Sequence, residues 1–319
     1  MKLNYTAFAF GMATAILSTT MANAAADKRI VLLTGIAGDP MYVTMGCGAQ
    51  DVAKKHGYTF DSQGPLKWDA ALQRPILDSI IASKPAGIIV VPTDDTALTR
   101  ALKQAQSQGI KIALADTRTK DLSVAVSFVT ADDDAVGKSA FEAMKKLAPQ
   151  GGEVMSIAGE PGVSTSDGRV AAFRAAAAAD PKFKDLGVQY GQSDTTRAAN
   201  VISSTLQRHP HLVGIFSVDS DDADGAAAAV RQANLTGKVQ IVTVDAVPGQ
   251  ISAVKDGNQQ ALIAQKPYEE GAQAAEQLIA SIEGRTPKAR VLTDTTIITK
   301  ANVDTPEGKA AAYRTECSK

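Results

Sequence analysis

The sequence predicts an α/β protein built from two doubly wound lobes, each with a parallel sheet covered by helices on both faces. Apolar β-branched runs alternate with amphipathic stretches along the whole chain, as in repeated βαβ units. The alternation starts again after residues 150–152, which indicates two similar halves. The 319 residues also suit two domains, each large enough for its own core.

In the first half, continuous apolar runs predict strands at residues 30–33, 88–91 and 112–114, and residues 124–129 are interpreted as a crossover that leads to the next helix. Apolar residues at helical spacing predict the helices between them, and Asp132 is a good N-cap for the last of these. Pro75 lies inside one helical stretch, so that helix either begins there, which we favour, or kinks there. The four helices contain, in order, Met45, Ala49, Val52 and Ala53; Ile76, Ile80 and Ile81; Leu98, Leu102 and Ala105; and Val136, Ala140, Phe141, Met144 and Leu147.

The second half repeats this pattern and is followed by a third, shorter part. The part after residue 265 predicts a helix at 269–282, one strand around 291–298 and a polar tail. We expect this tail to pack back across both halves rather than to form a third domain. The strands predicted in the second half are 154–157, 188–190, 213–216 and 239–244, and its helices are 169–179, 198–208 and 225–234.

Residues 1–24 have the form of a secretory signal peptide. Lys2 provides a positive charge, residues 6–17 are apolar, and residues 22–24 are a small-residue cleavage site. The apolar run is too short to span a bilayer, and no later segment offers the roughly 20 apolar residues of a membrane helix. The alternative to a signal peptide is that residues 6–17 form an ordinary buried helix. We expect a soluble periplasmic chain that starts near Ala25 and has no lipid anchor.

Charge and motifs exclude several classes of function. The formal net charge is -1 and no basic block occurs, so a nucleic-acid partner is not expected. The chain has no Gly-x-Ser-x-Gly elbow and no evident Ser/His/Asp arrangement, so we do not expect an enzyme. The glycine-rich segments 35–38 and 159–162 match neither a dinucleotide fingerprint nor a P-loop. We interpret them as tight turns and expect no cofactor.

No metal site is expected either. The acidic run 219–222 lacks the glycine and distal glutamate of an EF-hand loop, and we expect Ser220 or Asp221 to cap the helix that follows. The three histidines, His56, His209 and His211, do not have the spacing of zinc ligands.

Two cysteines, Cys47 and Cys317, lie near opposite ends of the chain. Export makes a disulfide between them chemically permissible, and the alternative is two unrelated buried thiols. A bridge would tie the tail to the first helix and would stabilise the protein by about 2–5 kcal/mol, mainly through the unfolded state.

Several short motifs occur in a characteristic order after successive strands. They are Asp39-Pro40-Met41-Tyr42, Pro92-Thr93-Asp94, Asp116, Arg169 with Phe173, Val244-Asp245 and Ala264-Gln265. Their order and spacing resemble those of the ribose/galactose-type periplasmic binding proteins of sugar ABC transporters. The resemblance covers essentially the whole chain after the leader.

This resemblance implies two lobes joined by a multi-strand hinge, with ligand held between them at the carboxyl ends of the strands. It places residues 25–130 and 266–293 in the N-terminal lobe. Residues 131–265 and 294–319 then form the C-terminal lobe and its tail. The function it implies is binding without catalysis.

The resemblance also implies a set of ligand-binding residues. Asp39 and Asp219 match amide positions, whereas Asp116 and Asp245 match carboxylates that accept hydrogen bonds from hydroxyls. Planar polar groups of this kind pair two neighbouring sugar hydroxyls at once. The remaining matches are Met41 and Tyr42 as stacking positions, Arg169 as a bidentate donor and Gln265 as the hinge amide.

Five positions depart from the ribose pattern, which leaves ribose itself in doubt as the ligand. Thr117 replaces an arginine that the adjacent Arg118 would substitute, and Thr195 and Met41 each replace a stacking aromatic. Asp39 and Asp219 replace neutral amides with acids. Trp68, the single tryptophan, lies in a loop on the expected cleft side and would supply a stacking face there.

Each of these residues also has a structural alternative. Asp39 suits an N-cap, Tyr42 suits core packing, and Trp68 suits an apolar contact between the lobes. Asp116 and Asp245 suit turns, and the alternatives for the other two are a surface position for Arg169 and a hinge-stabilising amide for Gln265.

We therefore expect a monomeric solute-binding protein that captures a monosaccharide or polyol and presents it to a membrane permease. Presentation to a chemotaxis receptor is compatible with this function. The excess of carboxylates in the expected site makes a cationic ligand, such as an amino sugar, the main rival. A ligand-sensing regulator and an exported enzyme are weaker alternatives.

Overall fold

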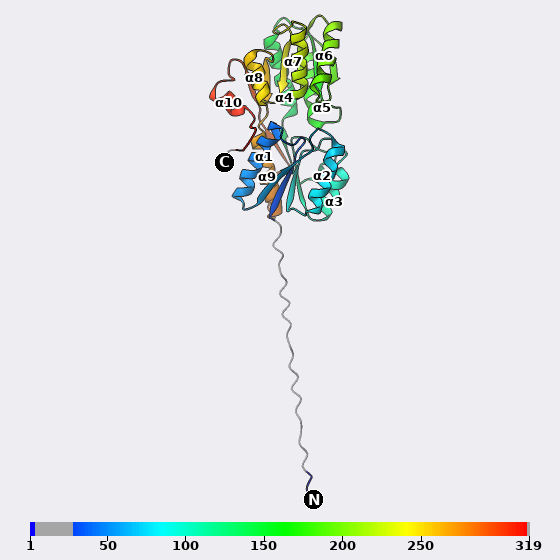
Figure 1. Ribbon diagram of the computed structural model, residues 1–319, viewed down its shortest axis with the longest axis vertical. Helices are drawn as coiled ribbons and strands as arrows, with labels where there is room; N and C mark the ends of the chain where they lie inside the picture. Colours follow the sequence, from blue (N-terminus) through cyan, green and yellow to red (C-terminus); the bar gives the residue numbers. More distant parts are fainter. Residues whose placement is uncertain (4–27, 318–319) are drawn as a thin grey trace.

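The computed structural model describes residues 1–3 and 28–317. Nearly all of the predicted signal peptide therefore lies outside the described residues. In the rest of the chain, every predicted strand and helix overlaps an observed element. The elements form two α/β lobes, one above the other in Figure 1, and this confirms the predicted fold class.

The N-terminal lobe contains a six-stranded sheet in which all strands are parallel. Helices α1 (Pro40–Lys55) and α9 (Pro267–Ile282) pack on one face, and α2 (Ala70–Ala82) and α3 (Thr99–Ser107) on the other. A short 3-10 helix, Leu122–Val124, precedes the fifth strand. The strand order is β11 (Arg290–Thr293), β5 (Ser127–Ala131), β4 (Lys111–Ala115), β3 (Gly87–Val90), β1 (Arg29–Leu33), β2 (Thr59–Gln63).

The C-terminal lobe repeats this order with an antiparallel strand, β12, at one edge. Helices α4 (Asp133–Leu147) and α5 (Ser164–Ala178) cover one face, and α6 (Thr195–Arg208) and α7 (Ser220–Gln232) the other. Helices α8 (Pro248–Asp256) and α10 (Pro306–Ala311) lie beside this lobe. The strand order is β12 (Thr296–Thr299), β10 (Ala261–Ala264), β9 (Gln240–Val244), β8 (Leu212–Ser217), β6 (Gly152–Ala158), β7 (Phe183–Tyr190).

The backbone crosses between the lobes in three places: between β5 and α4, between β10 and α9, and between β11 and β12. The last crossing corrects the prediction of one strand at 291–298. The chain leaves the first sheet after Thr293 and enters the second at Thr296, because the two halves of this apolar stretch pair with different sheets.

Pro75 does not begin a helix, which corrects the favoured prediction. Helix α2 starts one turn earlier, where Asp69 Oδ1 accepts a hydrogen bond of 2.7 Å from Ala71 N. Gln73 anchors this first turn. Its amide nitrogen donates to the carbonyl oxygens of Thr34 at 3.0 Å and Val91 at 2.7 Å. These contacts fix the start of the helix at Ala70, so that Pro75 lies inside the helix.

Besides the short 3-10 helix, five elements were not predicted from the sequence: β2, β5, β10, α8 and α10. Strand β2 is a polar edge strand, so it lacks a continuous apolar run. Helix α8 did carry a signal, because Pro248 stands at its first position and Gly257, with φ of 78°, caps its end.

The tail crosses both lobes, as predicted. Cys317 forms a disulfide with Cys47 of α1, with the Cα atoms 5.3 Å apart, which confirms the predicted bridge. Among the described residues, no helix has the length and apolar character needed to cross a membrane.

Candidate functional site

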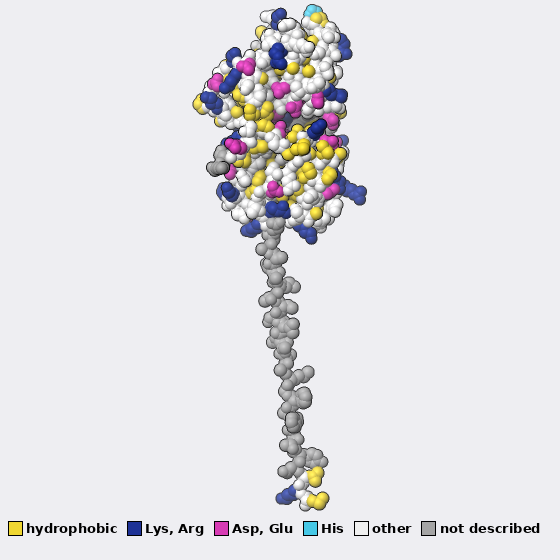
Figure 2. Space-filling view, viewed as in Figure 1, with side chains coloured by type: hydrophobic (Ala, Val, Ile, Leu, Met, Phe, Trp, Pro, Cys, Tyr) yellow, Lys and Arg dark blue, Asp and Glu magenta, His cyan; other side chains and the backbone are white. Residues whose placement is uncertain are grey.

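A cavity lies between the lobes at the carboxyl ends of the strands of both sheets. Its volume is about 90 Å³, and since one buried water needs roughly 10–15 Å³, it has room for a small molecule. On the face seen in Figure 2, acidic side chains lie beside a hollow at the boundary of the lobes. The cavity is lined by Ile36, Asp39, Met41, Tyr42, Trp68, Asp116, Gly159, Glu160, Val163, Thr165, Ser166, Arg169, Ser193, Val218, Asp219, Ser220, Asp221, Asp245 and Gln265.

The start of α1 brings three predicted residues to the cavity. Asp39 caps the helix, accepting a hydrogen bond of 2.8 Å from Met41 N, and also lines the cavity, so both of its expected roles are compatible. Tyr42 is buried and its hydroxyl donates to Asp116 Oδ2 at 3.2 Å. The N-terminal lobe thus presents a carboxylate and an aromatic ring side by side.

Trp68 extends this aromatic surface. Its ring stacks on that of Tyr42, with the centroids 6.4 Å apart and the planes at 23°. Gly35 makes this position possible, because a Cβ atom there would lie 2.2 Å from Cζ3 of Trp68. The glycine that was interpreted only as part of a tight turn therefore also provides space for the tryptophan.

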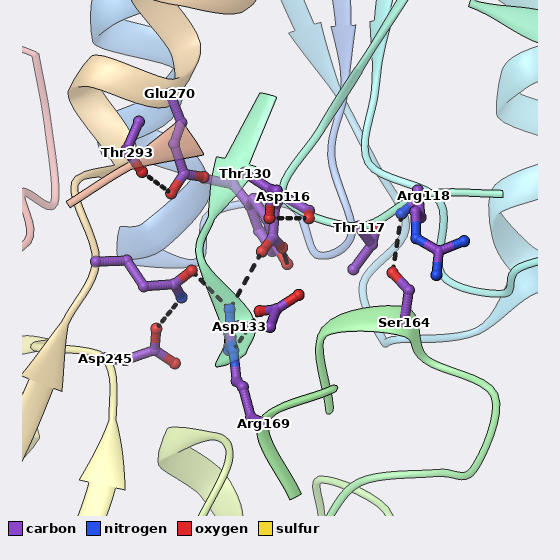
Figure 3. Close-up of polar contacts among 12 residues, drawn as sticks. Asp116, Thr117, Arg118, Thr130, Asp133, Ser164, Arg169, Asp245, Glu270 and Thr293 are labelled. Atoms are coloured by element: carbon purple, nitrogen blue, oxygen red, sulfur yellow. Dashed lines mark hydrogen bonds and ion pairs between the residues drawn. The ribbon is translucent and has the colours of Figure 1, made fainter. Parts of the chain in front are cut away.

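Arg169 is the single basic side chain among the lining residues. It is 4% exposed and extends from α5 toward the N-terminal lobe, as Figure 3 shows. Its Nε donates to Asp133 Oδ1 at 3.0 Å, and Nη2 lies 3.9 Å from Asp116 Oδ1. These two carboxylates compensate the buried charge, which would otherwise be costly.

Gln265 joins the two sides of the site at the hinge. Its Oε1 accepts a hydrogen bond of 2.7 Å from Arg169 Nη2, and its Nε2 donates to Asp245 Oδ1 at 3.0 Å. A continuous polar network therefore runs from Tyr42 to Asp245. We call its five members, Tyr42, Asp116, Arg169, Gln265 and Asp245, the polar cage.

Burial controls the ionisation of the acids at this site. Burial and the nearby Asp245 carboxyl raise the pKa of Asp39 to about 6. Burial raises the pKa of Asp116 to about 7, although Arg169 opposes the rise. Burial also raises the pKa of Asp219 and of Asp245. A ligand that donates hydrogen bonds to these carboxylates would favour their charged forms.

Three predicted residues do not line the cavity. Thr117 is buried beneath the site, with its hydroxyl donating to Pro92 O at 2.6 Å. Arg118 points away from the polar cage in Figure 3 and is exposed, and its backbone N–H donates to Ser164 Oγ at 3.1 Å. It therefore does not substitute for the missing arginine. Thr195 is exposed at the start of α6, facing Asp221 O.

Asp219 is both the cap of α7 and a lining residue. Its Oδ1 accepts from Asp222 N at 2.8 Å, so the expected cap at Ser220 or Asp221 is wrong. Its other oxygen faces the hydroxyl of Ser193 at 3.4 Å. In the described part of the chain, no group of three or more His, Cys, Asp or Glu residues is placed to hold a metal ion.

Several residues of the site were not predicted from the sequence. Glu160 belongs to the segment 159–162, which was interpreted only as a turn, and Ser193 precedes α6. Behind Asp116, Glu270 is fully buried and accepts a hydrogen bond of 3.1 Å from Thr293 Oγ1 (Figure 3). Burial and the Asp116 carboxyl raise its pKa well above the usual range. A glutamate in the first turn of a helix gives no sequence signal for such burial.

Comparison with known proteins places this geometry in a family. Residues 30–286 match the periplasmic binding protein domain. The ribose import binding protein RbsB of Salmonella typhimurium is 31% identical over 90% of this chain and 96% of its own. The D-allose-binding periplasmic protein of Escherichia coli is 30% identical over 84% of this chain and 88% of its own.

Solved structures agree with the sequence relatives. A solute-binding protein from Agrobacterium vitis with bound α-D-tagatopyranose has a TM-score of 0.87 and 30% identity, covering 90% of this chain and 99% of its own. A second, with bound D-fucose, has a TM-score of 0.83 and 25% identity, covering 89% and 100%. The chain, with its two α/β lobes and the cavity between them, therefore belongs to the periplasmic binding protein family.

Proposed function

We propose that the cavity between the lobes binds a neutral monosaccharide or polyol, and that the ligand-bound protein delivers this solute to the permease of an ABC transporter. The polar cage is the observation that carries the proposal. It joins two carboxylates, a guanidinium and an amide through successive contacts, and such groups pair adjacent hydroxyls. Relatives that import ribose or bind allose support the choice of ligand class.

The proposed contacts with ligand involve nine of the residues predicted from the sequence. The rings of Tyr42 and Trp68 form an apolar face suited to the C–H side of a sugar ring. Family membership implies a periplasmic location, and we propose that residues 1–24 are cleaved on export. The proposed ligand-binding residues are Asp39, Met41, Tyr42, Trp68, Asp116, Arg169, Asp219, Asp245 and Gln265.

A thermal-shift screen of the chain from residue 25 onward tests this proposal. Its ligands are pentoses, hexoses, deoxy sugars, amino sugars, polyols and amino acids. A ligand at 100 times its dissociation constant adds about 2.7 kcal/mol to stability, which shifts the melting temperature by several degrees. We expect a response confined to one class of sugar or polyol. Silence across all sugars and polyols would overturn the proposal.

A cationic amino sugar is the second candidate, because five aspartates line the cavity against one arginine. If the ligand carries an ammonium group, its affinity falls as the pH rises past the pKa of its own amine. Isothermal titration from pH 6 to pH 9 separates the candidates. Equal affinity for the neutral sugar of the same configuration would exclude a requirement for the positive charge.

A further inference from the structure

The last described segment of the chain, residues 312–317, connects the two lobes; we call it the strap. It begins at the end of α10, beside the C-terminal lobe, and ends at Cys317 next to α1 of the N-terminal lobe (Figure 1). It therefore adds a fourth, disulfide-closed connection to the three backbone crossings of the hinge.

Tyr313 anchors the strap in the C-terminal lobe, directly behind the polar cage. Its side chain is 4% exposed, and its backbone N–H donates to Ala246 O at 2.9 Å. Its hydroxyl donates to Asp245 Oδ1 at 3.2 Å and accepts the backbone N–H of Gln265 at 3.0 Å. One hydroxyl thus contacts two members of the polar cage, although Tyr313 itself does not line the cavity.

The other end of the strap is attached to the helix that carries the N-terminal part of the site. Arg314 N donates to Thr44 Oγ1 at 2.7 Å, and the Arg314 guanidinium lies 5.1 Å from the centre of the Tyr268 ring. Cys47, the disulfide partner, is on α1, which also carries Tyr42. The strap therefore links the two sides of the site through residues that do not line the cavity.

The strap is short enough to limit separation of the lobes. Only residues 314–316 lie between Tyr313 and Cys317, and an extended chain spans at most about 3.6 Å per residue, so these two Cα atoms cannot be more than about 14 Å apart. The Cα atoms of the two cysteines are a further 5.3 Å apart. As long as Tyr313 keeps its buried position, wide opening on this side of the hinge is excluded.

From these contacts we infer that the strap is part of the binding machinery. Tyr313 acts as a positioning residue for Asp245 and Gln265. The disulfide acts as the restraint that holds the lobes near the ligand-bound arrangement. The inference rests on the proposed function of the cavity. A restraint that removes open conformations, but is compatible with the bound one, raises affinity because less conformational freedom is lost on binding.

The first experiment compares Tyr313→Phe with the matched control Tyr58→Phe. Tyr58 is buried in the N-terminal core and does not line the cavity. Isothermal titration uses the best sugar or polyol from the screen. We expect the affinity of Tyr313→Phe to fall on the order of tenfold, the effect of one hydrogen bond to a charged group, while Tyr58→Phe binds as the wild type does. Because phenylalanine keeps the ring, unchanged affinity in Tyr313→Phe would show that the tyrosine only fills space.

The pH profile of affinity separates positioning from packing. Burial raises the pKa of Asp245, while Arg169 and the hydrogen bonds from Gln265 and Tyr313 oppose the rise. Loss of the Tyr313 hydroxyl should therefore move the decline in affinity on acidification to higher pH. A profile that does not move in Tyr313→Phe would contradict the role of the hydroxyl. The other carboxyls that interact electrostatically with Asp245 are those of Asp39, Asp116 and Asp221, and they are unchanged in this variant.

The second experiment removes the disulfide with the double substitution Cys47→Ser, Cys317→Ser. Small-angle X-ray scattering of the ligand-free protein should give a larger radius of gyration than that of the oxidised wild type, and titration should give weaker binding. The matched control is wild-type protein treated with reductant, which should behave as the double variant does. An unchanged radius together with unchanged affinity would overturn the restraint.

These outcomes separate the inference from the proposed function. If the wild type binds no sugar or polyol, the proposed function fails, and the scattering comparison still tests the restraint. If the wild type binds, but Tyr313→Phe and the double variant bind equally well, the strap inference fails and the proposed function stands.

Discussion

Asp116 and Asp245 occupy equivalent positions in the two lobes. Each directly follows the fourth strand of its sheet, counted from β2 or β7, and each has a positive φ, 57° for Asp116 and 79° for Asp245. A non-glycine residue in this conformation costs roughly 1–3 kcal/mol. Aspartate and asparagine tolerate this conformation better than other non-glycine residues, because their short polar side chains form hydrogen bonds to the nearby backbone. The repeated fold thus directs one carboxylate from each lobe toward the same cavity.

Replacement of either carboxylate should abolish tight binding. Asparagine is the suitable substitution, since it tolerates a positive φ that alanine does not. We expect Asp116→Asn and Asp245→Asn each to lower affinity about 10- to 100-fold, the loss of one or two hydrogen bonds to a charged group. Calorimetry measures the affinity and circular dichroism the fold. Asp294→Asn, with a side chain 93% exposed, is the control, and wild-type affinity in either cage variant would remove that residue from the site.

Trp68 should report ligand binding directly. It is the single tryptophan of the chain, and it lies on the cavity wall against Tyr42. We expect ligand to change the intensity or wavelength of its fluorescence in a saturable way. Trp68→Phe should bind more weakly and lose the signal. A saturating ligand that leaves the tryptophan emission unchanged would place the solute away from this ring.

Arg169 should matter for stability as well as for binding. Its removal leaves the buried carboxylate of Asp116 and the partly buried carboxylate of Asp133 without their counter-ion. We expect Arg169→Met to lower the free energy of unfolding by about 3–5 kcal/mol, the usual effect of breaking a buried ion pair. Urea unfolding measures it, with the exposed Arg208→Met as control. A loss below about 1 kcal/mol, as at an exposed ion pair, would contradict burial of the charge.

The ligand-free protein should become less stable as the pH rises from about 4 to about 7. Burial raises the pKa of Asp39 to about 6 and of Asp116 to about 7, from 3.8. The folded state therefore binds more protons than the unfolded state in this window, and its stability declines as these groups ionise. Carboxyls with lowered pKa, such as Asp94, act only below this window.

Urea unfolding between pH 4.5 and pH 8 checks this expectation. The decline should be smaller in Asp116→Asn, which cannot ionise at that position. A free energy of unfolding that instead rises steadily to pH 7 would show that the cage carboxyls are charged in the ligand-free protein.

Close packing of α1 on α9 depends on glycine. A Cβ atom at Gly48 would lie 1.9 Å from the carbonyl oxygen of Tyr268. Gly48→Ala should therefore lower the free energy of unfolding by about 1–3 kcal/mol. Gly249→Ala is the control, because it lies in helix α8 with no atom within 4 Å, and it should be neutral or stabilising by about 0.4–1 kcal/mol. Equal stability of the two variants would mean that the helices separate without cost.

The sequence by itself determined the two-lobe α/β fold and nine of the residues that line the cavity between the lobes. Continuous apolar runs such as 30–33 become buried strands because both faces of a parallel sheet are covered, and this leaves a local signal. Asp116 and Asp245 follow β4 and β9, which belong to different sheets, and both line the cavity because the carboxyl ends of both sheets face it. The cysteine pair was limited to one intramolecular bridge by its number.

Only the tertiary structure decided how individual side chains are used. Thr117 directs its hydroxyl to a neighbouring loop, and Arg118 faces solvent, although their positions beside Asp116 suggested ligand contact. Tyr313 bonds to Asp245, 68 residues away, from a tail whose composition is ordinary. Periodicity records which residues a strand or helix buries, but a hydrogen bond between distant segments depends on how those segments pack, and that information is spread over the whole chain.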